Sequence, residues 1–432
     1  MKLTLEKPVY GGDCLAHAGG AQAGKTVFVP LVLPGETVTA HLTEEKRSFA
    51  KAEVDEILLA SPHRVAHRCP YFGACGGCHY QHADYATQLG MKQQILRETL
   101  ARAGVAVPAE IGVLAGDPWG YRNRIRVAFT PGGEFGYRGR RSHSIAPIDE
   151  CPIAAPMLLQ VAKQIAKFIA ENSGIAAISE LELFTDRDET QILLTLFCEQ
   201  PSADGAQVWF AALQAALPPQ VTGLRLQLAD GSIIPRVLAS IGEAQLTYFA
   251  AGFGYRVDHG AFFQVNRWLI DEFVGLVTQT HNSETHSGKS AWDLFAGVGL
   301  FARALTANFA QVLAVESAPA SFEALRHNLE GTTGRAVGST TLDFLRRNRE
   351  QREAAPELIV LDPPRAGLGE ETTRLLNAIG AREIVYVSCD PATLARDLRA
   401  LTGERYKVEK ITLVDMFPQT FHLETMVHLR RS

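Results

Sequence analysis

The sequence lacks the features of an exported, membrane-embedded or fibrous protein. No apolar run approaches the roughly 20 residues that span a bilayer, and Met1–Glu6 has no signal-peptide core. The seven cysteines are an odd number without an export signal, which argues against a disulfide framework and indicates the reducing cytoplasm. A surplus of positive charge is also absent, because 42 Lys and Arg stand against 47 Asp and Glu. Coating of nucleic acid by bulk charge is therefore disfavoured, whereas a local basic groove stays open.

The composition is that of a globular protein, and the length suffices for about three domains. Residues 1–60 alternate apolar and polar positions between Gly and Pro turns, which predicts a small β-barrel. Residues 61–257 mix strands and helices as a central α+β domain. Its helix at 84–103 is a candidate to pack on the last domain instead. In residues 258–432 short apolar strands alternate with helices, which predicts βαβ units in a parallel, doubly wound α/β sheet.

A glycine-rich turn follows the first strand of this α/β domain. Gly297 and Gly299 lie where a strand ends and a helix begins, so the backbone there can approach a ligand closely. Glu316 ends the next strand, and a carboxylate at that place can accept both hydroxyls of a ribose. Position 302 is Ala where a dinucleotide fingerprint has a third glycine, which favours S-adenosylmethionine (SAM) over NAD. A tight turn without a ligand is the alternative.

Three further polar side chains lie near the ends of apolar strands. Asp362 precedes Pro-Pro, a rigid turn at the edge where open α/β sheets bind ligands. Cys389 ends a strand just before a helix, and a helix N-terminus favours the thiolate that a nucleophile needs. Core packing is the alternative for this thiol. Glu424 is either a base beside Cys389 or a solvated carboxylate, and its spacing alone favours the second.

Together these segments resemble the RNA 5-methyluridine methyltransferases, SAM-dependent enzymes that methylate C5 of uracil in tRNA or rRNA. The resemblance covers essentially the whole chain. The pieces that carry it are Cys69-x5-Cys75-Gly-Gly-Cys78-x-x-Gln81-His82, Phe263-Gln264-Val265-Asn266, Asp362-Pro-Pro-Arg365, Ser388-Cys389-Asp390-Pro391 and His422-Leu-Glu424. Each piece alone is weaker than the set.

The resemblance implies a Rossmann-like SAM methyltransferase domain at the C-terminus and an N-terminal TRAM domain, an RNA-binding barrel. The branch acting on 23S rRNA often has this barrel together with a four-cysteine [4Fe–4S] cluster. The implied cluster ligands are Cys69, Cys75, Cys78 and Cys151. The implied SAM-binding residues are Gln264, Phe295, Gly297, Gly299, Glu316 and Asp362. The implied nucleophile is Cys389 and the implied base is Glu424. At Leu300 the chain departs from the familiar 23S enzyme, whose polar residue there contacts SAM.

This chemistry needs such residues because C5 of uracil is a poor nucleophile. A thiolate that adds to C6 makes C5 reactive, and a base must then remove the C5 proton before the thiol leaves. The target base must leave its stack to reach them. We expect Phe262 or Phe263 to stack on a base, with core packing as the alternative.

Contact with RNA must be local in a chain of net charge -5. Six arginines lie between residues 119 and 145 with aromatic residues among them, a pattern that suits folded single-stranded RNA. The expected RNA contacts are Arg122, Arg124, Arg138, Arg140 and Phe263. A solvated hairpin face is the alternative for the arginines. We expect 23S rRNA, in a single-stranded or loop region, as the partner, no membrane contact, and a cytoplasmic monomer.

Several alternatives remain at this stage. Four cysteines can hold zinc as well as an iron–sulfur cluster, and His67, His79 and His82 are possible zinc ligands. A tRNA uridine is an alternative target. Methylation of an amino group is a second enzyme class, although it needs no thiol. A non-catalytic RNA-binding iron–sulfur protein is a third hypothesis.

Overall fold

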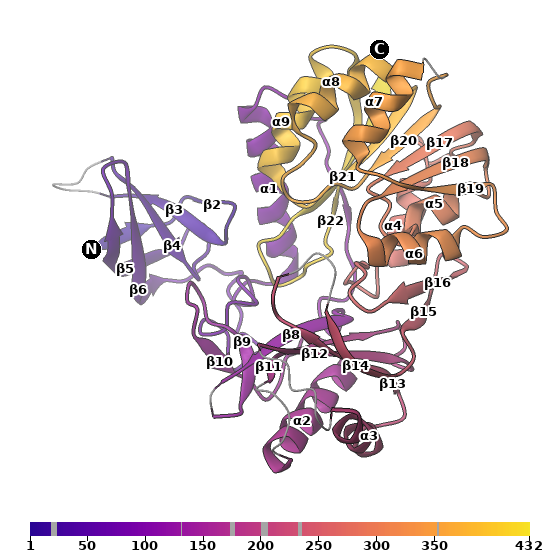
Figure 1. The fold of residues 1–432 in the computed structure, drawn as a ribbon. Coiled ribbons are helices and arrows are strands. Elements are labelled where there is room, and N and C mark those ends of the chain that lie inside the picture. The colour runs from indigo at the N-terminus through magenta and orange to yellow at the C-terminus, as the bar shows by residue number, and fades with distance from the viewer. Residues whose placement is uncertain (19–23, 131, 173–177, 200–205, 232–235, 352–353) are drawn as a thin grey trace.

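The computed structural model describes residues 1–18, 24–130, 132–172, 178–199, 206–231, 236–351 and 354–432 (Figure 1). An N-terminal sheet, a central sheet with two helices and a large C-terminal α/β sheet follow one another. Among the helices of these residues, none has the length and apolar character needed to cross a membrane.

The N-terminal sheet has six strands in the order β1-β5-β6-β4-β3-β2. Alternate residues are buried, so that side chains such as Val38 and Ala40 of β5 face one common core. The strands are β1 (Lys2–Thr4), β2 (Lys7–Pro8), β3 (Asp13–His17), β4 (Thr26–Pro30), β5 (Thr37–Glu45) and β6 (Phe49–Leu59).

The central sheet has seven strands in the order β10-β9-β8-β11-β12-β13-β14. Helices α2 and α3 share a hydrophobic core with its strands (Figure 1). The elements are β8 (Arg124–Phe129), β9 (Phe135–Arg138), β10 (Ile145–Pro147), α2 (Pro156–Glu171), β11 (Ile178–Thr185), β12 (Ile192–Cys198), α3 (Ala206–Ala216), β13 (Val221–Leu228) and β14 (Val237–Gly242).

The C-terminal sheet has eight strands in the order β19-β18-β17-β20-β21-β23-β22-β7. Strands β19 to β21 are parallel, and β23 lies antiparallel between β21 and β22. The chain order reverses between β17 and β20, which makes the carboxyl ends of these two strands the switch point where such sheets bind ligands. The elements are β17 (Gly288–Leu294), α5 (Leu300–Leu305), β18 (Phe309–Glu316), α6 (Pro319–Asn328), β19 (Gly334–Gly338), α7 (Thr341–Gln351), β20 (Leu358–Leu361), α8 (Gly369–Ile379), β21 (Glu383–Ser388), α9 (Pro391–Thr402), β22 (Tyr406–Val414) and β23 (Glu424–Arg431).

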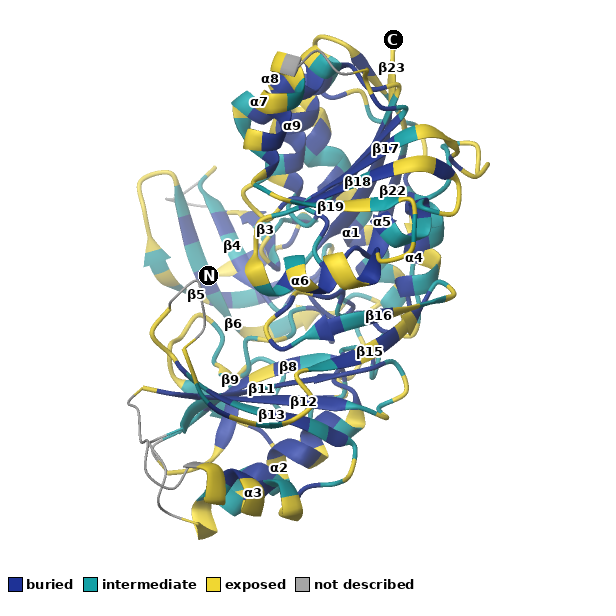
Figure 2. Ribbon diagram, turned by 45° about the vertical axis from the view of Figure 1, so that its right-hand side comes forward, coloured by how far each residue is buried: buried dark blue, intermediate teal, exposed yellow. Residues whose placement is uncertain are grey.

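Both faces of this sheet are covered, as the mostly buried strands of Figure 2 indicate. Successive side chains of a strand point to opposite faces, so Val360 of β20 enters one core while Ile359 and Leu361 enter the other. The apolar runs predicted as strands in residues 258–432 are therefore strands whose two faces are both buried.

Segments from before the C-terminal domain complete its sheet. Helix α1 (Tyr85–Arg102) contacts α9, and β7 (Gly112–Leu114) pairs with β22 as the outermost strand. The hairpin of β15 (Gln245–Ala250) and β16 (Phe253–Asp258) shares a core with α4 (Ile270–Val277). Packing of apolar faces, and not chain order, thus joins these segments to the C-terminal unit.

Candidate active site

The glycine turn after β17 has the strained backbone of a ligand-binding loop. Phe295, Gly297 and Gly299 have φ of +68°, +56° and +90°. Residues other than glycine rarely adopt this left-handed conformation, because it raises the free energy of the backbone, and Phe295 is such a residue. A Cβ at Gly299 would lie 2.6 Å from Leu325 Cδ1, so only glycine fits where α5 begins. This turn lies at the switch point of the sheet.

Glu316 ties the turn to the end of β18. Its Oε2 accepts a hydrogen bond from the Gly297 amide (2.9 Å), and its Oε1 accepts from the amides of Ser317 (2.7 Å) and Ala318 (2.6 Å). A carboxylate offers about four lone-pair positions, so acceptor capacity remains for a ribose hydroxyl.

Two carboxyl groups lie beside this turn, of which Asp293 is buried and Asp362 is half-buried. Asp293 is fully buried; its Oδ2 accepts from the Ala302 amide (2.8 Å), while its Oδ1 has no partner among the described residues. Burial raises the pKa of Asp293 and that of Asp362 to about 7 each. Gln264 Nε2 donates to Asp362 Oδ2 at 3.4 Å, which brings two of the expected SAM contacts together. Such groups are typical of functional sites rather than of stable cores.

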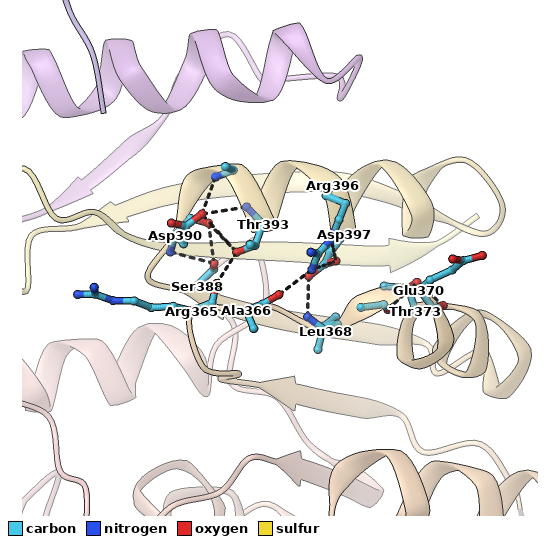
Figure 3. A network of polar contacts seen from close by, with 12 residues as sticks. Arg365, Ala366, Leu368, Glu370, Thr373, Ser388, Asp390, Thr393, Arg396 and Asp397 are labelled. Carbon is cyan, nitrogen blue, oxygen red and sulfur yellow. Dashed lines mark hydrogen bonds and ion pairs between the residues drawn. The ribbon is translucent and has the colours of Figure 1, made fainter. Parts of the chain in front are cut away.

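Figure 3 shows how the loop after Asp362 is fixed to the start of α9. Asp390 caps this helix, and its Oδ1 accepts from the amides of Ala392 and Thr393 at 2.9 Å each. Thr393 Oγ1 donates to the Arg365 carbonyl (3.1 Å), so the Asp-Pro-Pro-Arg loop and the turn carrying Cys389 hold each other.

The register of an antiparallel strand brings Glu424 to Cys389. Ser388 at the end of β21 pairs with Thr425 of β23, so the next residues along, Cys389 and Glu424, are neighbours at the edge. Glu424 is 5 % exposed, and its Oε1 has no hydrogen-bond partner among the described residues. Burial and the Asp362 carboxylate raise the pKa of Glu424 well above its usual range, against the effect of Arg365.

The environment of Cys389 corrects one expectation. Burial, with the carboxylates of Glu424 and Asp362, raises the pKa of the Cys389 thiol to about 12, although Arg365 lowers it. The sequence predicts that the helix N-terminus favours the thiolate, but a macrodipole contributes only about 0.3–1 kcal/mol near a surface, and burial of the thiol beside two carboxyl groups outweighs it. The thiol is therefore protonated in the free protein at neutral pH.

The loop before Glu424 is held by helix α1. Buried Lys92 donates to Asp415 Oδ1 (2.6 Å) and to the Phe417 carbonyl (3.0 Å). Gln88 Nε2 donates to Gln419 Oε1 (3.0 Å), and the Gln419 amide donates back to Gln88 Oε1 (3.1 Å). Sequence reasoning missed these clamps; the signal was a lysine on the buried face of an amphipathic helix.

Four thiols line one cavity of about 200 Å³: Cys69, Cys75, Cys78 and Cys151. All seven cysteines of the chain are free. Burial raises the pKa of Cys75 to about 11 and that of Cys78 to about 12, and in both cases the thiol of Cys151 raises it further. Within the described ranges no three His, Cys, Asp or Glu side chains form a group suited to one metal ion. The structure therefore gathers the thiols without forming a compact single-ion site.

The histidines considered as zinc ligands do not line this cavity. His82 Nε2 lies 3.2 Å from the Val32 carbonyl, and His67 Nδ1 lies 2.8 Å from the Cys69 carbonyl. The His79 ring packs edge-on against Phe421. Thr420 and His422, from the loop before Glu424, do line the cavity. The thiols therefore share one loop with the end of the C-terminal sheet at which Cys389 and Glu424 lie. This end of the sheet is called the catalytic edge below.

A model of the tRNA (uracil-5-)-methyltransferase family matches residues 84–432. The chain belongs to this family. The expected resemblance is thereby confirmed. A 23S rRNA (uracil(1939)-C(5))-methyltransferase RlmD of Halomonas elongata is 33% identical, and the match covers 96% of this chain and 88% of that protein. An RNA methyltransferase of Streptomyces avermitilis is 35% identical, with 97% and 95% covered.

A solved structure has the same fold as this family member. It is the Pyrococcus abyssi tRNA (uracil-54, C5)-methyltransferase in complex with S-adenosyl-L-homocysteine, with a TM-score of 0.76 and 22% identity. The match covers 99% of this chain and 100% of that one. The α/β methyltransferase fold expected from the sequence is confirmed by this likeness.

The arginines expected on the RNA-binding face of this methyltransferase have mostly structural partners. Arg124 is 16% exposed, pairs with Glu182 (3.2 Å) and lies over the Phe184 ring. Arg140 binds both Glu53 oxygens (2.9 and 3.0 Å), and so links the central and N-terminal sheets.

The other two expected RNA contacts, Arg122 and Arg138, differ in their surroundings. Arg122 lines the cysteine cavity, and its Nε donates to the Arg124 carbonyl (3.0 Å). Only Arg138 of the four has an exposed side chain, at 59%, and its nearest carboxylate oxygen, on Glu180, is 3.8 Å away. The charges of Arg124 and Arg140 are already paired, so an RNA face made by all four arginines stays a prediction, and Arg138 has the side chain best placed for it.

Phe263 has no free face for a base, so its expected stacking on RNA is corrected. Its ring is 2% exposed and packs on Tyr248 with centroids 4.5 Å apart. Phe262, the other candidate, is 60% exposed. Core packing thus accounts for Phe263, and Phe262 remains the candidate for stacking.

Proposed function

We propose that this methyltransferase transfers the methyl group of SAM to C5 of a uridine in 23S rRNA. The observation that carries the proposal is the pair of Cys389 and Glu424 beside the glycine turn and Asp362. Covalent activation of uracil needs a thiol and a base at one place, whereas methylation of an amino group needs no thiol. Relatives named for 23S rRNA that match nearly the whole chain support the choice of RNA.

Gln264, Glu316 and Asp362 are the proposed SAM contacts, with the turn from Phe295 to Gly299. Their acceptor oxygens suit ribose hydroxyls and the cationic amino-acid part, and the turn leaves backbone open to a close ligand. SAM supplies an electrophilic methyl group when it is bound. Leu300 offers no polar contact at the start of α5, so the other residues must provide the binding.

Cys389 and Glu424 divide the chemistry between them. The Cys389 thiol gives its proton to solvent, the resulting thiolate bonds to C6 of the flipped uracil, and the electron pair of the C5–C6 double bond moves toward O4 as an enolate. C5 then takes the methyl group, with S-adenosylhomocysteine as the leaving group. Glu424 removes the C5 proton, the double bond re-forms, and the Cys389–C6 bond breaks to release the thiolate. The raised pKa of Glu424 suits a group that must accept a proton near neutral pH.

We also propose that Cys69, Cys75, Cys78 and Cys151 hold a [4Fe–4S] cluster. Tetrahedral zinc with bonds of about 2.3 Å would need sulfurs roughly 3.8 Å apart, whereas the thiols surround a cavity of about 200 Å³. Four thiolates around such a space suit a larger cluster. Anaerobically purified protein should contain iron and acid-labile sulfide, and zinc alone would overturn this assignment.

The remaining proposals concern the domains and the cell. Residues 1–60 are proposed as a TRAM-type RNA-binding barrel and 258–432 as the catalytic domain. Residues 61–257 are proposed as the central cluster-bearing domain, apart from α1, β7 and the β15–β16 hairpin, which join the C-terminal unit. A cytoplasmic location is proposed because ribosomal RNA is available there. A monomer is proposed as the oligomeric state. The N-terminal sheet has the alternating burial that a small barrel requires.

A uridine in tRNA is the second candidate target, favoured by the likeness to a tRNA (uracil-54, C5)-methyltransferase. Methyl-labelled SAM should be incubated with 23S rRNA fragments and, separately, with tRNA transcripts. Nucleoside mass analysis is expected to give 5-methyluridine from 23S rRNA. 5-Methyluridine from tRNA alone would establish the second target, and a methylated amino group would refute uracil-C5 chemistry.

A further inference from the structure

Tyr10 extends from the N-terminal sheet to the catalytic edge. It follows β2 in a turn with Gly11 and Gly12, and its Oη lies 3.5 Å from the carbonyl oxygen of Cys389, 379 positions further along. Its ring meets the Phe421 ring edge-on, with centroids 5.4 Å apart. The side chain therefore contacts both the turn that carries the nucleophile and the loop that leads to Glu424.

The surroundings of the Tyr10 hydroxyl are those of the catalytic edge. Burial, Asp390 and Cys389 raise its pKa far above the usual value, and Arg365 opposes them. The phenol is therefore a protonated hydrogen-bond donor at every pH at which the enzyme would work. Its natural acceptors are the Cys389 carbonyl and the Asp390 carboxylate.

Contacts on both sides fix the turn in this place. Lys7 Nζ pairs with Glu98 of α1 (2.6 Å), and Asp13 accepts both of its short bonds from Arg141 (2.6 and 2.7 Å). Gly12 has φ of +94°, and a Cβ there would lie 3.1 Å from the His79 ring. The backbone conformation and the close His79 ring thus favour glycine at position 12.

We propose that Tyr10 is a positioning residue for Cys389, by which the N-terminal sheet completes the catalytic edge. Its hydroxyl holds the turn from Ser388 to Asp390, and its ring holds Phe421 on the other side. The sheet then has a role beyond a contact with RNA, since the nucleophile is aligned only when the sheet is docked. This inference rests on the proposed uracil-C5 chemistry.

The first test compares Tyr10→Phe with Tyr406→Phe in the full chain. Tyr406 is a matched control, because its hydroxyl also donates to a carbonyl, that of Ala381 (3.2 Å), but at the opposite end of the same sheet. Covalent adduct formation with saturating SAM and 5-fluorouridine RNA is followed in a single turnover, and RNA Kd is measured by filter binding. Tyr10→Phe should slow adduct formation about 5- to 10-fold with RNA Kd unchanged, as expected for a misplaced nucleophile.

A second readout needs no RNA. Iodoacetamide alkylation of Cys389 is measured on its peptide by mass spectrometry, with buried Cys198 of the central sheet as the internal reference. Tyr10→Phe should increase alkylation of Cys389 about threefold or more, because a loosened turn exposes the thiol, while Cys198 is unaffected.

The outcomes separate this inference from the proposed function. An unchanged adduct rate, equal alkylation in all variants, or a weakened RNA Kd that alone explains a slower adduct would each overturn the positioning role. If the wild-type protein forms no adduct, the uracil-C5 proposal fails instead, and alkylation still decides whether Tyr10 holds Cys389.

Discussion

The catalytic edge of the C-terminal sheet and the arginine-rich segment of the central domain pair their charged groups differently. At the edge, oxygens of Asp293 and Glu424 are buried without a hydrogen-bond partner among the described residues. In the central domain, Arg124 and Arg140 each bind a carboxylate, although Arg124 Nε and Arg140 Nη1 are also buried without a partner among those residues. Buried polar groups without partners cost stability and persist where function needs them, whereas paired charges hold structure. The sequence suggests a functional role for both regions.

Replacing the proposed base tests the edge with the largest expected effect. Glu424→Gln should lower methylation turnover by about 10²- to 10⁴-fold, because general-base catalysis is lost. Methylated RNA should remain covalently attached to Cys389, since the C5 proton cannot leave. Gel analysis with labelled SAM measures both effects. Glu409→Gln, an exposed carboxylate on neighbouring β22, is the control, and equal turnover in the two variants would refute the role of Glu424.

Asp362→Asn tests the effect of the Asp362 charge on Cys389, the proposed nucleophile. The Asp362 carboxylate raises the pKa of Cys389, so its removal should lower that pKa and speed thiol alkylation at pH 9 about 3- to 10-fold. The pKa of Asp362 is about 7, and below it wild type and variant should converge because the carboxyl group is protonated. The pH profile of alkylation measures this, with the exposed Asp343→Asn as control. A pH-independent difference would contradict the charge effect.

At the catalytic edge, the sequence predicts the elements but not how they lie next to one another. The helix expected at 84–103 is α1 (Tyr85–Arg102), and the strand expected to end at Cys389 is β21 (Glu383–Ser388). Strand ends follow from local apolar runs and turns, so the residues of the catalytic edge could be found. The neighbourhood of Cys389 and Glu424 could not, because it depends on an antiparallel strand inserted between two others.

The partners of the arginines are long-range and could not be predicted from the sequence. The carboxylates of Asp13 and Glu53 lie 128 and 87 positions before the arginines that they bind. Nothing in the spacing of the arginines shows that their charges are paired in the fold. Tyr10 was missed for the same reason, since its place depends on how the N-terminal sheet docks.

Arg140→Gln should destabilise the protein without affecting the chemistry. It removes a partly buried bidentate pair, which costs roughly 1 kcal/mol of the free energy of unfolding. Denaturant unfolding measures this change. Unchanged stability together with weaker RNA binding would return Arg140 to the RNA-binding face.

Arg138→Gln should have the smallest effect. In contrast to Arg140→Gln, it should weaken RNA binding and leave the stability unchanged. Its exposed guanidinium is available for a phosphate, so RNA Kd should rise about threefold. The slope of log Kd against log salt concentration should fall by about one, because one phosphate contact is lost. Filter binding at several salt concentrations is the measurement, and an identical slope in both proteins would exclude a phosphate contact.

The central claim is that Cys389 attacks uracil, and a covalent trap tests it most directly. The protein is incubated with SAM and 23S rRNA fragments containing 5-fluorouridine, in which fluorine at C5 cannot leave as a proton does. Wild type should form an adduct that survives denaturing gels, mapped to Cys389, and Cys389→Ala should form none, while Cys198→Ala should react as wild type does. Methyl transfer without any adduct, or an adduct that persists in Cys389→Ala, would contradict the account.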